Sequence, residues 1–198
     1  MTMLIPPALN EKEVVLASAS PRRQMLLREL GIPFKIDVRE IKEECPGNNL
    51  PPDEIALCLA KMKADRFPAE ELKENTLVIT ADTVVSLKGQ LIGKPMSRQD
   101  AIEMIGRLSG NMHTVYTGVC IKSKHKERSF VDETRVWFAH IPQQEIIRYV
   151  DACKPYDKAG SYGIQEWIGY ACVERIEGSF FNVMGLPTHR LYQELTIF

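Results

Sequence analysis

The chain has 198 residues, of which 44% are hydrophobic and 26% charged, and this length suffices for one compact domain over residues 1–198, or two closely joined lobes, with a large buried core. The formal net charge is −1 and no long block of Lys and Arg occurs, so we expect no nucleic-acid partner, although a mononucleotide would need only a few local cations. The five cysteines are scattered without a C-x-x-C pair, which argues against structural zinc and fits reduced thiols in the cytoplasm. Neither a signal peptide nor a membrane-spanning segment is predicted.

The first informative stretch covers residues 14–31, where a short apolar strand runs into a turn of small residues and then into a helix. Ser20 is expected to cap that helix and Pro21 to occupy its first position. Free N–H groups at a helix start attract anions, and the Arg22–Arg23 pair adds charge suited to phosphate. The stretch therefore predicts a phosphate-binding turn, distinct from a P-loop because no Gly-Lys-Ser/Thr follows the strand. The alternative is a pair of solvated arginines on a surface helix.

A loop rich in Pro, Gly and Asn over residues 43–53 precedes a helix on which Lys63 borders the buried stripe. Residues 77–80 predict a buried strand that ends at Asp82 and Thr83. Because open α/β sheets form their ligand crevice at the carboxyl ends of strands, Asp82 is the strongest catalytic candidate, able to hold a divalent cation or to accept a proton from water. Each residue also has a simpler interpretation. Asp82 would be a solvated loop residue or a cap, Thr83 would be a β-branched strand residue without a ligand, and Lys63 would be a surface lysine.

The later elements mix strands and helices without a strict βαβ order. The pattern predicts a hairpin around Lys88-Gly89, a helix with a Ser97–Asp100 capping box, paired strands over 115–121 and 130–141, a helix after Pro142, strands over 171–176 and 180–184, and a C-terminal helix. This mixture favours an α/β fold with a mixed sheet flanked by helices over a pure Rossmann order.

Two further segments carry candidate ligand-binding residues. Lys94 lies between a glycine and a proline, whose restrained backbone would aim its charge at phosphate, although a surface-turn lysine fits equally well. In the loop over residues 157–165, glycines permit close approach of a ligand, and Gln165 offers donors and an acceptor suited to a nucleobase edge. The alternative is a flexible surface loop. His113, a lone histidine before a strand, is expected to be a structural hydrogen-bonding residue.

Several motifs follow one another along the chain: Ser18-Ala-Ser-Pro-Arg-Arg23, Ala81-Asp-Thr83, Gly93-Lys-Pro95, Leu108-Ser-Gly110 with His113, Asp157-Lys-Ala-Gly160, and Glu174-Arg-Ile-Glu-Gly178 followed by Asn182 and Gly185-Leu-Pro187. In this order and spacing they resemble the Maf family of nucleoside triphosphate pyrophosphatases, over nearly the whole chain. Several independent motifs at matching spacing are far more specific than any one of them.

The resemblance implies an elongated, ITPase-like mixed sheet in two α/β lobes with a central cleft, and usually a homodimer. It implies hydrolysis of a nucleoside triphosphate to the monophosphate and pyrophosphate with a divalent cation, Mg²⁺ or Mn²⁺. By motif, Asp82 takes the place of the proposed general base, and Glu43 can join it as a second metal carboxylate. The substrate-binding positions of the family fall on Ser18, Arg22, Lys63, Thr83, Lys94 and Gln165.

The motifs Tyr162-Gly-Ile-Gln165 and Asn182-Val-Met-Gly-Leu-Pro187 resemble the dTTP/UTP branch of the family. Two departures stand out: the acidic pair common in the family reads Lys42-Glu43, and Glu166-Trp167 replaces the glycine that commonly follows Gln165. The expected function is house-cleaning hydrolysis of dTTP and UTP, with a modified pyrimidine or damaged purine triphosphate as an alternative substrate. A nucleotide-binding regulator of cell division without significant catalysis is the alternative of another class.

Overall fold

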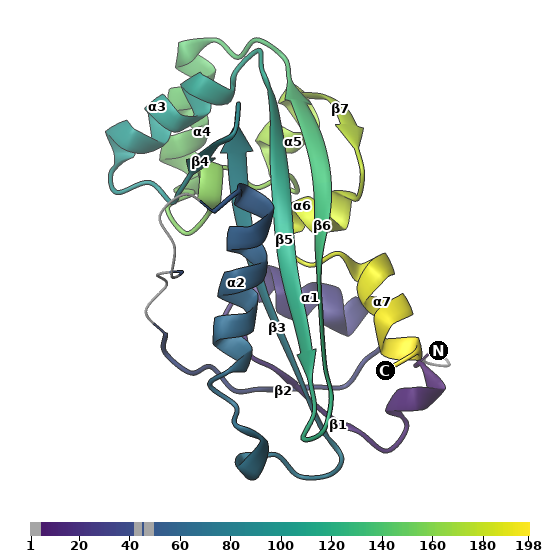
Figure 1. Cartoon of the computed structure of the whole chain (residues 1–198). Helices are drawn as coiled ribbons and strands as arrows, with labels where there is room; N and C mark the ends of the chain where they lie inside the picture. The colour runs from purple at the N-terminus through teal and green to yellow at the C-terminus, as the bar shows by residue number, and fades with distance from the viewer. Residues whose placement is uncertain (1–4, 42–44, 46–49) are drawn as a thin grey trace.

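The computed structural model describes residues 5–41, 45 and 50–198, and its strands form one seven-stranded sheet (Figure 1). The strands are β1 (Glu13–Leu16), β2 (Lys35–Ile36), β3 (Thr76–Leu87), β4 (Gln90–Ile92), β5 (Met112–Lys122), β6 (Glu127–Phe138) and β7 (Val173–Glu177). Their order is β2-β1-β3-β5-β6-β7, with β4 paired to β3. β1 is parallel to β2 and β3, whereas the remaining pairs are antiparallel, so the predicted mixed sheet is confirmed.

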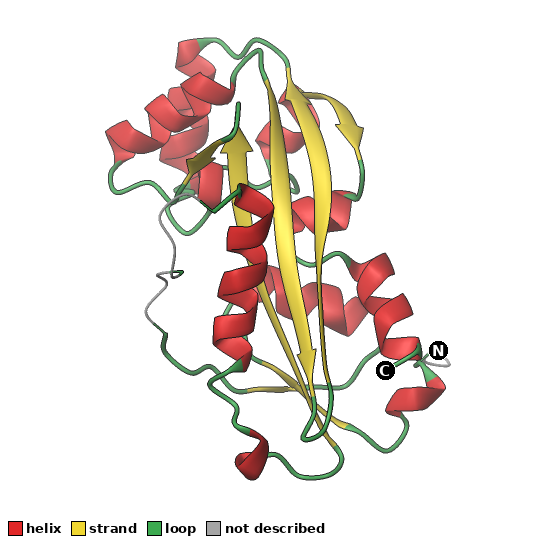
Figure 2. Ribbon diagram, in the orientation of Figure 1, coloured by secondary structure: helices red, strands yellow, loops and turns green. Residues whose placement is uncertain are grey.

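Helices cover both faces of the sheet and gather at its two ends (Figure 2). They are α1 (Pro21–Glu29), α2 (Pro52–Ala64), α3 (Arg98–Leu108), α4 (Gln143–Cys153), α5 (Trp167–Cys172), α6 (Phe180–Met184) and α7 (Thr188–Thr196), with short 3₁₀ turns η1 (Pro7–Leu9), η2 (Ala69–Glu71) and η3 (Ala159–Ser161). α3 and α4 lie at one end of the long strands, and α1 and α7 lie toward the other (Figure 1). Among the described residues, none of these helices has the length and apolar character needed to cross a bilayer.

Helix α2 packs unusually close to the sheet because small residues meet at the contact. Its buried face carries Ala56, Ala60 and Ala64. A Cβ atom on Gly118 of β5 would lie 2.2 Å from the carbonyl oxygen of Ala56, so only glycine fits there. The hydroxyl of Thr80 donates to the Ala60 carbonyl at 2.6 Å. This packing holds the helix, and with it Lys63, directly over β3.

Strand β3 has two different neighbours along one edge. β1 pairs with its first part as far as Ile79, and β4 pairs with its last part from Val85 onward. Between them, residues 80–84 have no ladder partner on that edge within the described part of the chain. The chain leaves β1 at this point and begins α1, as expected for a ligand crevice at the carboxyl end of a parallel strand.

β3 is longer than the sequence pattern predicted. It runs unbroken from Thr76 to Leu87, so Asp82 lies in mid-strand and not beyond the carboxyl end of a strand. The register places Asp82 opposite Gly118, and this ladder with β5 keeps the backbone extended although aspartate disfavours strands. The carboxyl end beside Asp82 is that of the neighbouring strand β1.

Two other local predictions were wrong. Residues 180–184 form helix α6 and not a strand, because the Ser179 hydroxyl accepts the Asn182 N–H and Gly185, with φ of +114°, ends the helix. Ser20 makes no side-chain cap for α1; its own N–H instead donates to the Ser18 hydroxyl at 3.3 Å. Pro21 does occupy the first helical position.

The other turn signals were correct. Lys88 and Gly89 have φ values of +51° and +81° and join β3 to β4 as a tight hairpin. The Ser97 hydroxyl accepts the Asp100 N–H at 3.1 Å, while the Asp100 carboxylate accepts the Met96 N–H at 2.8 Å. The capping box therefore closes one residue earlier than the usual pattern.

Candidate active site

A cleft of about 640 Å³ opens at the gap in the β3 edge. Its walls come from the turn after β1 and the start of α1, from α2, from the middle of β3, and from the segments that follow β4, α4 and α6. The predicted site residues that the structure describes all line this one cleft: Ser18, Arg22, Lys63, Asp82, Thr83, Lys94 and Gln165. Sequence positions up to about 150 apart are thus brought together, whereas Glu43 falls outside the described residues.

Asp82 and Lys63 form an ion pair on the α2 side of the cleft. Their side chains are only 14% and 17% exposed, so the pair is largely removed from bulk water while remaining on the cleft surface. Charges in such a position interact more strongly than on an open surface. Asp82 and Thr83 are also the two residues of β3 that are not buried, because the sheet has its gap there.

Arg23 connects three walls of the cleft on the opposite side of the strand. Its Nε donates to the carbonyl oxygen of Gly185 at 2.7 Å, and Nη2 donates to the Thr83 hydroxyl at 3.0 Å. Nη1 lies 3.4 Å from the Ser18 hydroxyl, a long contact. The guanidinium therefore joins α1, β3 and the end of α6, a bridge that a lysine with a single nitrogen could not reproduce.

Arg22, the other arginine of the pair, reaches across the cleft. Its Nη1 lies 3.0 Å from the Asp157 carboxylate, and Lys158 contacts the other carboxylate oxygen at 2.8 Å. Partial burial opposes ionisation of Asp157, but the hydrogen bond and charge of Lys158 and the charge of Arg22 outweigh it, so the pKa of this carboxyl is lowered. Lys158 is in turn held by Glu166 at 3.1 Å, which gives the departure at position 166 a structural role.

Gln165 lines the cleft, and its side chain carries a buried acceptor without a partner in the described part of the chain. Its Oε1 atom is buried and has no hydrogen-bond partner among the described residues. A Cβ atom on Gly163 would lie 2.7 Å from Glu166 Cδ and 2.8 Å from Gln165 Nε2, so a larger residue there would displace these two side chains. A buried acceptor without a partner costs free energy unless a ligand supplies a donor.

Behind this wall, Tyr162 and His113 form a buried pair that is structural, as predicted for His113. The Tyr162 hydroxyl lies 2.7 Å from His113 Nε2, and both rings pack edge-on against Phe138. Burial lowers the pKa of His113 to about 4 and raises the pKa of Tyr162. The neighbouring Trp167 is 45% exposed at the start of α5 and does not line the cleft.

Lys94 is exposed at the mouth of the cleft, where its turn is tied to the opposite loop. The carbonyl oxygen of Gly93 accepts the N–H of Gly160 at 3.0 Å, so a backbone hydrogen bond joins the two cleft-lining segments. Lys94 is thus mounted on a fixed turn while its ammonium group reaches solvent.

The donor set can be compared with what a divalent cation requires. In the described part of the chain, no group of three or more His, Cys, Asp or Glu side chains is placed to hold a metal. Mg²⁺ bound to a nucleotide, however, takes one or two carboxylates and completes its shell with phosphate oxygens and water. Asp82 supplies one such carboxylate on the cleft surface, so the residues present fit a cation that arrives with a phosphate ligand.

The sequence pattern did not single out Thr117, and it drew attention to Asn182 only as part of a motif. Thr117 lies directly behind Thr83, with the two hydroxyl oxygens 2.9 Å apart. Asn182 anchors α6 to β5 and β6 through its amide group. No local signal marks either residue, because a buried threonine in a strand and an asparagine in a short helix are both common.

A mixed sheet with cations and a carboxylate around a gap at a helix start is typical of binding sites for phosphate-bearing ligands. A sequence profile of the family described as "Maf-like protein" matches residues 13–198, so the chain belongs to the Maf family.

Curated relatives support this assignment. A protein of Porphyromonas gingivalis named dTTP/UTP pyrophosphatase is 48% identical over 192 residues, which is 96% of each chain. One of the same name from Christiangramia forsetii is 46% identical over 187 residues, or 94% of each chain. Among solved structures, the Staphylococcus aureus Ham1 protein shows a distant likeness, with 16% identity and a TM-score of 0.43 over 65% of this chain and 72% of that one.

Proposed function

We propose that this chain hydrolyses dTTP and UTP to the nucleoside monophosphate and pyrophosphate. The observation that carries the proposal is the convergence of Arg22, Lys63 and Lys94 with the carboxylate of Asp82 on a single cleft. Cations alone would suffice to bind a polyphosphate, whereas a carboxylate among them favours a catalytic site. The names and the 46–48% identity of the relatives, over almost their full length, support the same activity.

The chain's own residues divide the work of phosphoryl transfer between charge neutralisation and positioning. Arg22, Ser18 and the free N–H groups at the start of α1 bind phosphate oxygens, and Lys63 and Lys94 neutralise further charge. Asp82 orients a water molecule at the α-phosphorus and accepts its proton, while pyrophosphate departs. The fold gathers these groups around one cleft, and Lys63 and Arg22 turn from their carboxylate partners to the phosphates when the substrate binds.

Asp82 would also be a ligand for Mg²⁺ or Mn²⁺, together with Glu43. Such an ion neutralises phosphate charge and fixes the triphosphate geometry. Oxygen ligands suit both metals, so the proposal covers either one. We expect turnover to stop when EDTA removes divalent cations and to return when Mg²⁺ or Mn²⁺ is added.

Selection of the base is assigned to Gln165. Its unpaired Oε1 can accept the N3–H of thymine or uracil, and its amide group can donate to a base carbonyl oxygen. A site built around such bonds rejects a base whose edge leaves its polar atoms unpaired.

The test is a panel of canonical and modified nucleoside triphosphates, scored by kcat/KM from released pyrophosphate. We expect dTTP and UTP to be among the best canonical substrates. If another base ranks above both, the proposed substrate class is wrong. Tight Mg²⁺-dependent nucleotide binding without any product would favour the non-catalytic regulator.

We further propose that the chain works as a homodimer in the cytoplasm. The family resemblance implies the dimer, and light scattering of the purified protein measures it. The five cysteines are all within the described residues and none forms a disulfide, which fits a reducing compartment.

A further inference from the structure

A chain of hydrogen bonds leads from α6 through the interior of the sheet to Thr83 at the cleft. Thr117 is fully buried, and its Oγ1 lies 3.0 Å from the carbonyl oxygen of Asn182 and 2.9 Å from Thr83 Oγ1. On the cleft side, Arg23 Nη2 donates to Thr83 Oγ1 at 3.0 Å. Each hydroxyl has one proton, so the order of donors along this chain is restricted.

The direction of the chain follows from its two ends. A carbonyl oxygen only accepts, so the contact with Asn182 requires the proton of Thr117. Because the Thr117 hydroxyl donates its one proton to the Asn182 carbonyl, its oxygen must accept the proton of the Thr83 hydroxyl. If Thr117 donated to Thr83 instead, its oxygen and the Asn182 carbonyl oxygen would face each other at 3.0 Å without a proton between them. The Asn182 carbonyl also accepts the Gly185 N–H at 2.9 Å, which uses its second lone pair.

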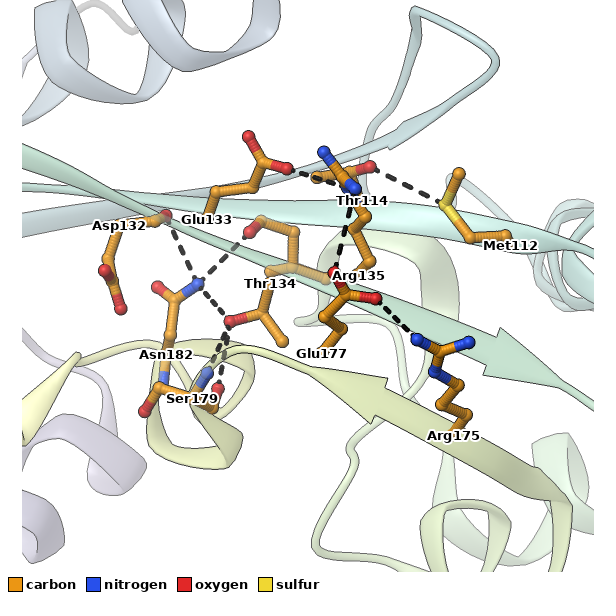
Figure 3. A network of polar contacts seen from close by, with 11 residues as sticks. Met112, Thr114, Asp132, Glu133, Thr134, Arg135, Arg175, Glu177, Ser179 and Asn182 are labelled. Atoms are coloured by element: carbon orange, nitrogen blue, oxygen red, sulfur yellow. Dashed lines mark hydrogen bonds and ion pairs between the residues drawn. The ribbon is translucent and has the colours of Figure 1, made fainter.

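The anchor of this chain is held firmly in place. The Asn182 side chain is fully buried, and the two protons of its Nδ2 are shared among three acceptors, the carbonyl oxygens of Val115 and Asp132 and the Thr134 hydroxyl, at 3.2, 3.2 and 3.0 Å. Figure 3 shows the Asp132 and Thr134 contacts, together with the bonds between Thr134 and Ser179 at the start of α6. The Asn182 carbonyl is therefore a fixed acceptor.

We propose that Thr117 is a positioning residue that holds the Thr83 hydroxyl as a hydrogen-bond acceptor toward the cleft. The Thr83 proton points to Thr117, and one lone pair is used by Arg23, so one lone pair is left for a ligand. The hydroxyl of Ser18 has the opposite hydrogen-bonding role, that of a donor toward the cleft. Its oxygen accepts from Arg23 and from the Ser20 N–H, so its proton is available for a phosphate oxygen.

This proposal rests on the proposed function, in which the ligand is a nucleoside triphosphate. The phosphate oxygens of that ligand are acceptors, so the group that donates to Thr83 must belong to the base or the sugar. A thymidine nucleotide offers two: the sugar 3′-hydroxyl, or the base N3–H, in which case Thr83 takes the N3–H in place of Gln165 Oε1 and Gln165 meets the base through its amide N–H. dCTP replaces the N3–H by an acceptor, and 3′-fluoro-3′-deoxythymidine triphosphate replaces the 3′-hydroxyl. Either change would set an acceptor against the lone pair of Thr83, and an unpaired or mismatched polar group in a buried site lowers kcat/KM by about ten-fold or more.

The experiment compares kcat/KM for dTTP with those two analogues in the wild type and in Thr117→Val. Gln165 alone can penalise dCTP in the wild type, so the diagnostic result is the change on substitution: we expect the penalty of one analogue to shrink about ten-fold in Thr117→Val, since the freed Thr83 proton can then turn to the ligand. If kcat/KM recovers for dCTP, the donor to Thr83 is the base N3–H; if it recovers for the 3′-fluoro analogue, the donor is the sugar 3′-hydroxyl. Thr117→Ser retains the hydroxyl and should retain the penalty.

Thr134→Val is the matched control. It removes another buried hydroxyl that contacts Asn182 but leaves the bond between Thr117 and Thr83 intact. An equal loss of selectivity in this variant, or an unchanged penalty for both analogues in Thr117→Val, would overturn the proposal. If Thr117→Val does not fold, Thr117→Ala removes the same hydroxyl. If the wild type releases no pyrophosphate, the proposed function fails, and the same ratios measured as dissociation constants still decide the role of Thr117.

Discussion

Asp82 and Thr83 are adjacent in β3, yet they belong to two different kinds of polar network. Successive strand residues point to opposite faces of a sheet, so Asp82 meets Lys63 from α2 while Thr83 meets Arg23 and Thr117 on the side of α1 and α6. The first network is a charge pair between two side chains. The second is a directional chain that runs from the Arg23 guanidinium through two neutral hydroxyls to a backbone carbonyl.

The difference shows how one strand can serve two requirements of a single substrate. A lysine ammonium is a compact charge on a flexible stem, so Lys63 can move from Asp82 to an incoming phosphate. The hydroxyl chain offers no such freedom because the Asn182 carbonyl fixes its direction. We therefore expect variants on the Asp82 side to change turnover, and variants on the Thr83 side to change selection and binding of the substrate.

The largest expected effect is that of Asp82→Asn. Loss of the carboxylate should lower kcat by at least about 10²-fold with folding intact, because the amide cannot accept the proton of the attacking water. Steady-state kinetics measures kcat, and circular dichroism checks that the variant is folded. Asp157→Asn, which alters the other cleft carboxylate, is the control and should lower kcat much less. Near wild-type turnover in Asp82→Asn would remove its catalytic assignment.

Lys63→Met should lower kcat/KM by about 30-fold, since one phosphate contact is lost and Asp82 loses its ion-pair partner. The double variant with Asp82→Asn is expected to lose little more than Asp82→Asn alone, because the two residues act as a pair. Independent losses that simply multiply in the double variant would show that the pair has no joint role.

Arg23→Lys tests the other side of the comparison. A lysine cannot bridge Gly185, Thr83 and Ser18 at once, so we expect KM for dTTP to rise about ten-fold with a smaller change in kcat. Arg28→Lys, on the exposed part of the same helix, should leave both constants unchanged. A loss confined to kcat would instead place Arg23 at the reacting phosphate.

The smallest effect on turnover is expected at His113, whose contribution appears in stability. Its pKa of about 4 lies below the ordinary value of 6.5, so between these pH values the unfolded chain binds a proton that the folded chain excludes. This term is fully present above pH 6.5, and as pH falls toward 4 it lowers the free energy of unfolding by about 3 kcal/mol. Denaturant unfolding at pH 7 and pH 4 should show this loss in the wild type but not in His113→Gln.

Local sequence signals predicted much of the fold, and they failed where tertiary contacts decide. The hairpin at Lys88-Gly89 and the capping box at Ser97 depend on neighbouring residues alone and were correct. The length of β3 depends on pairing with β5, which is remote in sequence, so Asp82 was placed at the end of a strand. The error at 180–184 has a different origin: the segment has the composition of a strand, and the local caps at Ser179 and Gly185 that make it helical were missed.

The candidate site shows the same limit. Motif order identified the cleft residues from Ser18 to Gln165, and the fold gathers the described ones in one place. No sequence pattern predicted that Arg23 would donate a hydrogen bond to Gly185, 162 positions away, or that Thr117 would lie behind Thr83. Such hydrogen bonds are set by the final packing, so they are visible only in three dimensions.

The most direct test of the account is hydrolysis of dTTP in water labelled with ¹⁸O, followed by mass spectrometry of the products. Attack of water at the α-phosphorus predicts one ¹⁸O atom in the thymidine monophosphate and none in the pyrophosphate. Label in pyrophosphate, or in thymidine diphosphate with inorganic phosphate, would contradict it, because the cleft would then direct water to another phosphorus atom.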